Sequence, residues 1–156
     1  MEQTFSMETL YQVAEIELVY KSKVKASERP KIITSKDAYK ILLQTWDEDK
    51  MELQEQFKIL LLNRGNKVVG IYEVSTGGIT GTVADPRLIF TAALKANAVA
   101  LILAHNHPSA SLKPSNADTT LTQKIKEGGK LLDINVMDHL IICNEGYYSF
   151  ADEGCI

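Results

Sequence analysis

Apolar and polar positions alternate between residues 13 and 24, and this period of two predicts a strand. Ile16, Leu18 and Tyr20 share one of its faces. The period then lengthens, and residues 35–46 fit an amphipathic helix with Ser35 as its N-cap. The inward stripe of this helix would consist of Ala38, Ile41, Leu42 and Thr45.

A hairpin is expected after the acidic stretch at residues 47–55. Residues 57–62 are apolar except for Lys58, and this run predicts a buried strand. Asn63-Arg64-Gly65-Asn66 predicts a turn, because Gly and Asn tolerate positive φ. Residues 67–75 would return as the antiparallel partner.

The second half of the chain alternates between helical and strand patterns. Asp85-Pro86 is typical of a helix start, with Asp as cap and Pro in the first turn. Gly128-Gly129 is typical of a helix end. The predicted elements are a helix over 86–97, a buried strand over 99–103, a helix over 116–127, and a hairpin with strands over 138–143 and 147–150. This alternation predicts a single layered α/β domain.

Composition narrows the class of protein. The 156 residues are 45% hydrophobic and 24% charged, as expected for one globular domain. The net charge of −3 offers no general attraction to nucleic acid, and the basic segment 21–31 lacks the aromatic residues of a nucleic-acid patch. Cys143 and Cys155 form neither a metal motif nor a disulfide framework. We expect a reduced, cytoplasmic protein without a signal peptide or membrane segment.

Two of the three histidines, His105 and His107, follow the buried strand at i, i+2 spacing. In an extended backbone both imidazoles project to the same side. Asp118 follows after a loop and can supply an oxygen ligand. Two imidazoles, a carboxylate and one open position are typical of a catalytic Zn²⁺ that keeps a bound water. Ser115 and Asp118 also fit a helix start, as N-cap and N3 acid, and the two interpretations are compatible.

Metal-assisted amide hydrolysis also needs a base for the proton of the water and a donor for the oxyanion. Glu55, just before the strand at 57–62, is the upstream candidate for the base, and Glu52 is its rival. The hydroxyl of Ser115 can donate to the tetrahedral oxygen. His139 precedes an apolar run, which favours a hydrogen-bonded structural histidine over a fourth ligand.

These residues together resemble the JAMM (MPN-type) metalloprotease signature: a Glu, then His-x-His-Pro, six residues, a Ser, two residues and an Asp. Here it reads Glu55, His105-Asn106-His107-Pro108, Ser115 and Asp118. The chain from about residue 33 to 156 is similar to the RadC-like JAB domain. The segments that carry this wider likeness are Glu55-Gln56-Phe57, Asp85-Pro86-Arg87, Leu103-Ala104-His105-Asn106-His107-Pro108-Ser109, Lys113-Pro114-Ser115, Asp138-His139 and Tyr148-Ser149-Phe150.

The resemblance implies a single-domain α/β/α sandwich of the MPN (JAB) type, akin to cytidine deaminases. The domain would span residues 33–156, after an N-terminal strand and linker over 1–32. The resemblance also implies a zinc-dependent peptidase or isopeptidase that acts on a peptide or protein substrate. Its Zn²⁺ ligands would be His105, His107 and Asp118. Glu55, favoured over Glu52 by the family register, and Ser115 would be the catalytic residues.

Two departures from the family pattern are visible. Longer RadC proteins carry an N-terminal helix-hairpin-helix region, whereas only a strand and a linker precede the domain here, so we do not expect tight DNA binding. Ala110 stands where the family usually has Gly, which matters if the loop needs a positive φ.

Other classes of function compete with a peptidase. A nucleobase deaminase would carry H-x-E with a P-C-x-x-C pair, whereas this chain has a second His, and Cys143 and Cys155 are spaced differently. A JAB scaffold without peptidase activity is a further alternative, although the intact ligand set argues against it. A DNA-repair-associated role rests on the family label alone. The sequence leaves the substrate and a possible homo-oligomer open.

Overall fold

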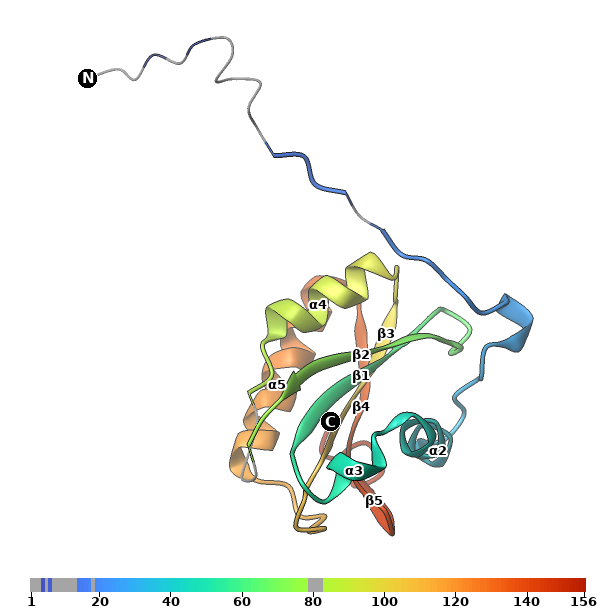
Figure 1. Ribbon diagram of the computed structural model, residues 1–156, viewed down its shortest axis with the longest axis vertical. Coiled ribbons are helices and arrows are strands. Elements are labelled where there is room, and N and C mark those ends of the chain that lie inside the picture. Colours follow the sequence, from blue (N-terminus) through green and yellow to red (C-terminus); the bar gives the residue numbers. More distant parts are fainter. Residues whose placement is uncertain (1–3, 5, 7–13, 18, 79–82) are drawn as a thin grey trace.

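A five-stranded sheet forms the centre of the molecule (Figure 1). The computed structural model describes residues 4, 6, 14–17, 19–78 and 83–156. The strands lie in the order β2-β1-β3-β4-β5, and neighbours are antiparallel except for the parallel pair β3 and β4. Their bounds are β1 Gln56–Leu62, β2 Val68–Thr76, β3 Ala100–Asn106, β4 Asn135–Cys143 and β5 Gly146–Ser149. Both predicted hairpins, β1 with β2 and β4 with β5, are confirmed.

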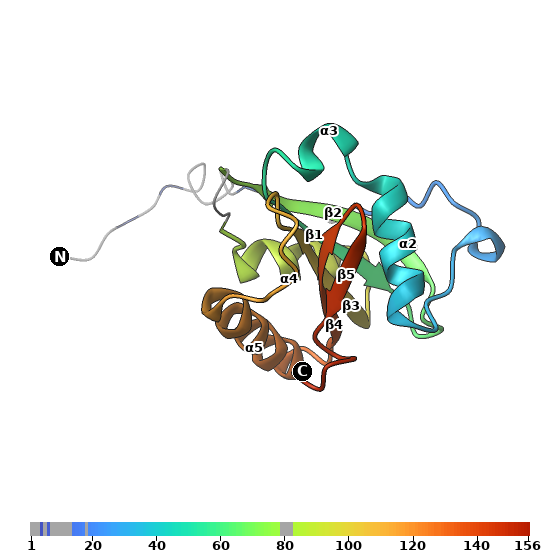
Figure 2. The same ribbon diagram turned by 90° about the horizontal axis from the view of Figure 1, so that it is seen from below.

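Helices cover both faces of this sheet, which confirms the predicted α/β/α arrangement. α2 and α3 lie on one face, whereas α4 and α5 lie on the other (Figure 2). Their bounds are α2 Ser35–Thr45, α3 Glu48–Met51, α4 Pro86–Lys95 and α5 Asn116–Leu131, and a 3₁₀ turn, η1, spans Ala26–Glu28. Among the described residues, no helix combines the length and the apolar character that crossing a membrane requires.

Strand β3 is buried along its whole length, and its side chains enter two separate cores. Leu101 and Leu103 pack in the core that contains Ile89 of α4. Ile102 packs in the opposite core with Leu42 of α2. A strand buried on both faces needs no alternation of polar and apolar residues, which explains its continuous apolar sequence.

The pairing of β1 with β3 positions the polar residues at one end of the sheet. Phe57 lies opposite His105 in this antiparallel register. Extending the register by two residues brings Glu55 opposite His107. Because side chains alternate along a strand, Glu55, Phe57 and His105 share the face that α4 and α5 cover.

The strand predicted for residues 13–24 is wrong in its described part. Residues 14–17 and 19–24 form no strand, while Val13 and Leu18 lie outside the described residues. Backbone pairing with the start of β2 comes from a later segment, because the N–H of Val68 donates to the Pro30 carbonyl at 2.9 Å. Tyr20 reaches the same strand with its side chain, whose hydroxyl donates to the Val69 carbonyl. Ile16 is 84% exposed, so this apolar position of the alternating pattern is not buried in a core.

The predicted N-cap of the first helix is wrong by one residue. Thr34 occupies the cap, and its backbone N–H donates a hydrogen bond to the Asp37 carboxylate at 2.9 Å. This capping box satisfies N–H groups that the helix itself leaves unpaired. The Ser35 hydroxyl lies 2.8 Å from the Tyr147 hydroxyl, so it links the helix to β5.

Helix α5 runs through Gly128 and Gly129, which were expected to end it. It ends at Leu131, followed by Asp133 at φ 54°. The N–H of Ile134 donates back to the Gly129 carbonyl at 2.9 Å, as in a Schellman motif with Asp in place of the usual Gly. A Cβ on Gly129 would lie 2.4 Å from the Ile134 carbonyl oxygen, so glycine is needed here for close packing.

Candidate metal centre

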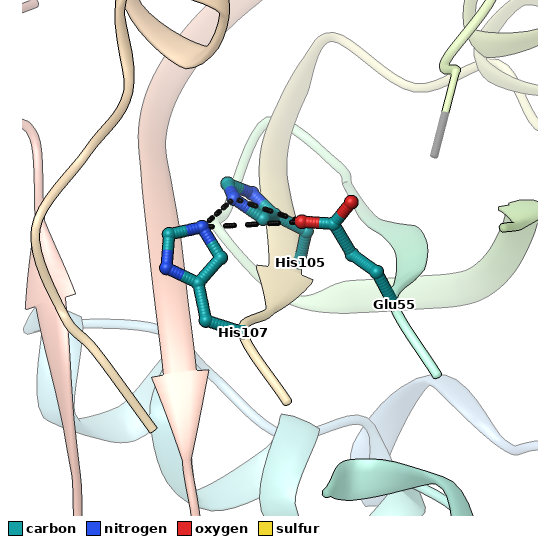
Figure 3. A group of neighbouring side chains, drawn as sticks. All are labelled: Glu55, His105 and His107. Carbon is teal, nitrogen blue, oxygen red and sulfur yellow. Dashed lines mark hydrogen bonds and ion pairs between the residues drawn. The ribbon is translucent and has the colours of Figure 1, made fainter. Parts of the chain in front are cut away.

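His105 and His107 present two imidazole nitrogens to each other at the end of β3 (Figure 3). Their Nε2 atoms are 3.0 Å apart. His105 lies inside β3 and is buried, whereas His107 immediately follows the strand and is partly exposed. The extended backbone therefore places both rings on one side, as their i, i+2 spacing predicts.

The opposite nitrogen of each ring is held by a partner. Nδ1 of His105 lies 2.8 Å from Nε2 of His139 on β4. Nδ1 of His107 lies 2.7 Å from the Ser111 carbonyl oxygen, which can only accept, so this nitrogen carries the proton in the hydrogen bond. The Nε2 atom of His107 then has a free lone pair when the ring is neutral.

Asp118 reaches the same point from the first turn of α5. One carboxylate oxygen lies 3.3 Å from His105 Nε2, and the other lies 3.5 Å from His107 Nε2. The backbone N–H of Ser115 donates to the carboxylate at 2.8 Å, and the Asp118 N–H donates to the Ser115 hydroxyl oxygen at 3.1 Å. This capping box aims the carboxylate from a rigid helix start.

Contacts with the two histidines favour the ionised form of the Asp118 carboxyl. Burial raises the pKa of Asp118, but hydrogen bonds with His105 and His107 outweigh burial and hold it far below its usual value. The hydrogen bond with Asp118 raises the pKa of His107, against a smaller opposing effect of burial. The carboxylate is therefore ionised across the working pH range and available as an oxygen ligand.

Glu55 approaches the two imidazoles from the residue just before β1. Its Oε1 atom is 3.9 Å from Nε2 of both His105 and His107. Glu55, His105 and His107 form a group that could hold a metal ion. Its rival Glu52 is exposed, and the Asn144 amide donates to it at 3.5 Å.

The structure brings Glu55, His105, His107 and Asp118 together, with Ser115 adjacent at the helix cap. The capping role of Ser115 is confirmed. Its role as an oxyanion donor stays a prediction. Ala110, in the loop after the histidines, has a φ of 63°. The loop does adopt the conformation that favours glycine, which costs a non-glycine residue about 1–2 kcal/mol.

Asn106, between the two histidines, is fully buried and was not singled out by the sequence. Its side chain points to the other face of the sheet, where Nδ2 donates to the carbonyls of Met51 and Gln54, each at 2.8 Å. Its Oδ1 accepts from the N–H of Gln56 at 2.7 Å. These bonds hold the backbone on both sides of Glu55. The signal in the sequence was a polar residue in a strand that is otherwise buried on both faces.

His139 supports the site from β4 and has no exposed surface. Its ring stacks on Phe150 with centroids 4.9 Å apart, and its Nδ1 lies 2.6 Å from the Thr122 hydroxyl on α5. Burial lowers the pKa of His139 well below its usual value, so the ring is neutral. The structural interpretation of this histidine is confirmed by these contacts, whereas the role of Thr122 has no signal in the sequence.

The comparisons with known proteins agree on one family. Residues 32–155 match the model of the RadC-like JAB domain. A relative from Flavobacterium johnsoniae, named "UPF0758 protein", is 48% identical over 124 residues, which cover 80% of this chain and 53% of the relative. A "UPF0758 protein" from Porphyromonas gingivalis is 46% identical over 104 residues, or 66% of this chain and 46% of the relative. A third, from Methanosarcina mazei, is 37% identical over 126 residues, or 81% and 54%.

The chain thus spans about half the length of the curated relatives it matches. The part that matches the family model includes Glu55, both histidines at the end of β3, and Asp118 at the start of α5. By the extent of this match and the identity to these relatives, the chain belongs to the RadC-like JAB domain family.

Proposed function

We propose that this protein is a zinc-dependent hydrolase that cleaves a peptide or isopeptide bond. The observation that carries the proposal is the convergence of three donor groups, the Nε2 atoms of His105 and His107 and the carboxylate of Asp118. Two imidazoles and one carboxylate are a donor set typical of catalytic zinc, which keeps its fourth position open.

The distances favour Asp118 over Glu55 as the third ligand. Zinc ligands at 2.0–2.1 Å in a tetrahedron are about 3.3 Å from one another. The two Nε2 atoms are 3.0 Å apart, Oδ1 of Asp118 is 3.3 Å from His105 Nε2, and Oδ2 of Asp118 is 3.5 Å from His107 Nε2. The Glu55 oxygen is 3.9 Å from both histidine nitrogens. A Glu-His-His group is also close enough to hold a metal ion, but these values support Glu55 as a neighbour of the ligands.

Different residues of the chain would then have different roles in hydrolysis. Bound zinc would lower the pKa of a water at its open position and polarise the scissile carbonyl. Glu55 would accept the proton of the attacking water and pass it to the leaving amine. The Ser115 hydroxyl would donate a hydrogen bond to the developing oxyanion. Glu52 is less suited to the role of base, because it is exposed and contacts Asn144.

The substrate class follows from this chemistry and from the family rather than from a shaped pocket. A peptide or isopeptide carbonyl is the electrophile that such a site attacks. The alternative is a JAB domain that acts as a scaffold or in DNA repair without peptidase activity. The nearness of Glu55 to the proposed ligands supports the enzyme, since a purely structural metal site needs no base. We also propose a cytoplasmic location, which the two free cysteines, Cys143 and Cys155, support.

Replacement of Glu55 tests the proposal. Glu55→Gln keeps the size of the side chain but cannot accept a proton. We expect zinc content and melting temperature near wild type, while hydrolysis of a fluorogenic peptide and isopeptide library falls by about 10²–10⁴-fold. Glu52→Gln is the matched control and should retain activity. Full activity in zinc-loaded Glu55→Gln would contradict the assignment.

Asp118→Asn separates the roles of the two carboxylates. An amide is a poorer zinc ligand than a carboxylate, so this variant should lose metal affinity, and its activity should return in proportion to zinc restored at high concentration. If Asp118→Asn keeps its zinc while Glu55→Gln loses it, the two assignments must be exchanged.

A further inference from the structure

A chain of hydrogen bonds leads from helix α5 through the buried His139 to the proposed zinc ligand His105. The Thr122 hydroxyl donates to the Asp118 carbonyl oxygen at 2.6 Å and lies 2.6 Å from His139 Nδ1. Nε2 of His139 lies 2.8 Å from Nδ1 of His105. The chain thus joins the helix that carries Asp118 to the strand that carries His105.

The direction of each bond follows from the number of protons available. A hydroxyl has a single proton, and that of Thr122 is given to the Asp118 carbonyl. Its oxygen can therefore only accept from His139, whose Nδ1 must carry the proton. A neutral His139 then has a bare Nε2 that accepts from Nδ1–H of His105. With its proton on Nδ1, neutral His105 has its Nε2 lone pair directed at the proposed zinc position.

Within the described part of the chain, the two ring nitrogens of His139 pair with Thr122 and His105. His139 and Thr122 are both buried, at 0% and 2% exposure, so solvent does not compete for these bonds. Phe150 stacks on the ring, and Phe57 lies against it with centroids 5.5 Å apart. These aromatic contacts fix the ring plane and leave its two nitrogens aimed at Thr122 and His105.

We propose that Thr122 and His139 are positioning residues that fix the tautomer of His105 for zinc binding. This inference rests on the proposed function, because it assumes zinc at His105. Groups that hold the distal nitrogen of a ligating histidine set its tautomer and orientation. The Thr122 hydroxyl contacts both sides of the site, namely the ring of His139 and the backbone carbonyl of Asp118.

The tautomers themselves give the first test. In zinc-loaded wild-type protein, long-range ¹H–¹⁵N correlation spectra of the three imidazoles should show the His139 proton on Nδ1. The same spectra should show His105 with its proton on Nδ1 and its Nε2 bound to metal. A His139 proton on Nε2 would overturn the inference, since that nitrogen could not then accept from His105.

Zinc affinity gives the second test and needs no substrate. Thr122→Val keeps the shape of the side chain but removes the acceptor, and we expect it to weaken zinc binding about 10–100-fold, measured by competition with a chromophoric chelator. Thr122→Ser restores the hydroxyl and should bind near the wild-type level. Thr119→Val is the matched control, because Thr119 makes the same bond to the carbonyl four residues back, at 3.2 Å, on an exposed surface.

His139→Phe provides an independent variant that keeps the stacked ring and lacks both nitrogens. It should weaken zinc binding by a similar factor. If wild type binds zinc and both Thr122→Val and His139→Phe match it, the inference is overturned while the proposed function stands. A wild-type protein that binds no zinc overturns both. Should either variant fail to fold, the wild-type spectra still decide.

Discussion

Asn106 shows how much one side chain can organise at the residue scale. It alternates with His105 and His107 along the strand, so it projects away from the imidazoles. Its amide pairs with backbone groups on both sides of Glu55. The His-x-His segment therefore presents imidazoles on one face of the sheet and holds the Glu55 backbone from the other.

Removal of this amide is predicted to destabilise the protein. Asn106→Ala would leave the buried Gln56 N–H and the Met51 and Gln54 carbonyls without their partner. Each unsatisfied buried group costs about 1–3 kcal/mol, so with three such groups we expect the free energy of unfolding to fall by about 3 kcal/mol or more in urea titrations. Asn135→Ala, at an exposed position on β4, is the control. An equally small loss of stability in both variants would show that the hydrogen bonds of the Asn106 amide contribute nothing.

The residues of the site differ in how far the sequence could identify them. His105, His107 and Asp118 carry metal-binding side chains at a local spacing, whereas Glu55 lies far from them in the sequence and was chosen by its resemblance to the family motif. Asn106 and Thr122 are ordinary polar residues whose partners lie far along the chain. Their roles follow only from the packing of distant segments, which no local pattern contains.

At the element scale, α5 shows why glycine alone is a weak signal for a helix end. Its end is fixed by Asp133 in the left-handed conformation and by the bond from Ile134 back to Gly129. Gly129 serves close packing, since the chain turns back against it. A Gly-Gly pair can therefore mark a helix end or a point of close packing inside a helix. Only the tertiary contact distinguishes the two.

Gly129→Ala should destabilise the protein, although alanine favours helices. The added Cβ would lie 2.4 Å from the Ile134 carbonyl oxygen, and backbone there must shift. Overpacking of this kind costs about 1–3 kcal/mol. We expect it to exceed the gain of about 1 kcal/mol in helix propensity.

Urea unfolding measures the effect, with Gly70→Ala as the control. A Cβ at Gly70, on β2, would meet nothing within 4 Å. Its stability should therefore be unchanged or slightly higher. A Gly129→Ala variant as stable as wild type would show that the helix end adjusts freely.

At the scale of the whole molecule, the layered α/β arrangement could be predicted from the sequence. Over residues 35–150, the spacing of apolar positions and the placing of turn residues indicate the same alternation of helices and strands. The hairpins and the helix start at Asp85-Pro86 depend on local chemistry. The segment 13–24 was misjudged because alternation shows only that a strand is compatible with the sequence. Whether a segment joins a sheet depends on an edge being available, and the backbone of residues 30–32 pairs with residues 66–68 at the start of β2.

Charge over the whole molecule leads to a prediction about DNA. With a net charge of −3, this chain has little to gain from the release of phosphate counterions. We expect duplex DNA to bind no more tightly than the general non-specific range of about 10⁻⁴–10⁻⁶ M at physiological salt. Fluorescence anisotropy with a labelled duplex measures this affinity. Nanomolar binding by this chain would refute the prediction.

We propose that His105, His107 and Asp118 together hold a zinc ion. The most direct test of this proposal is the zinc content of the purified protein, measured by mass spectrometry of the metal alongside protein concentration. We predict about one Zn²⁺ per wild-type chain and almost none in the His105→Ala/His107→Ala variant, because two of its three protein ligands are gone. Equal zinc content in the two proteins would contradict the assignment of these ligands.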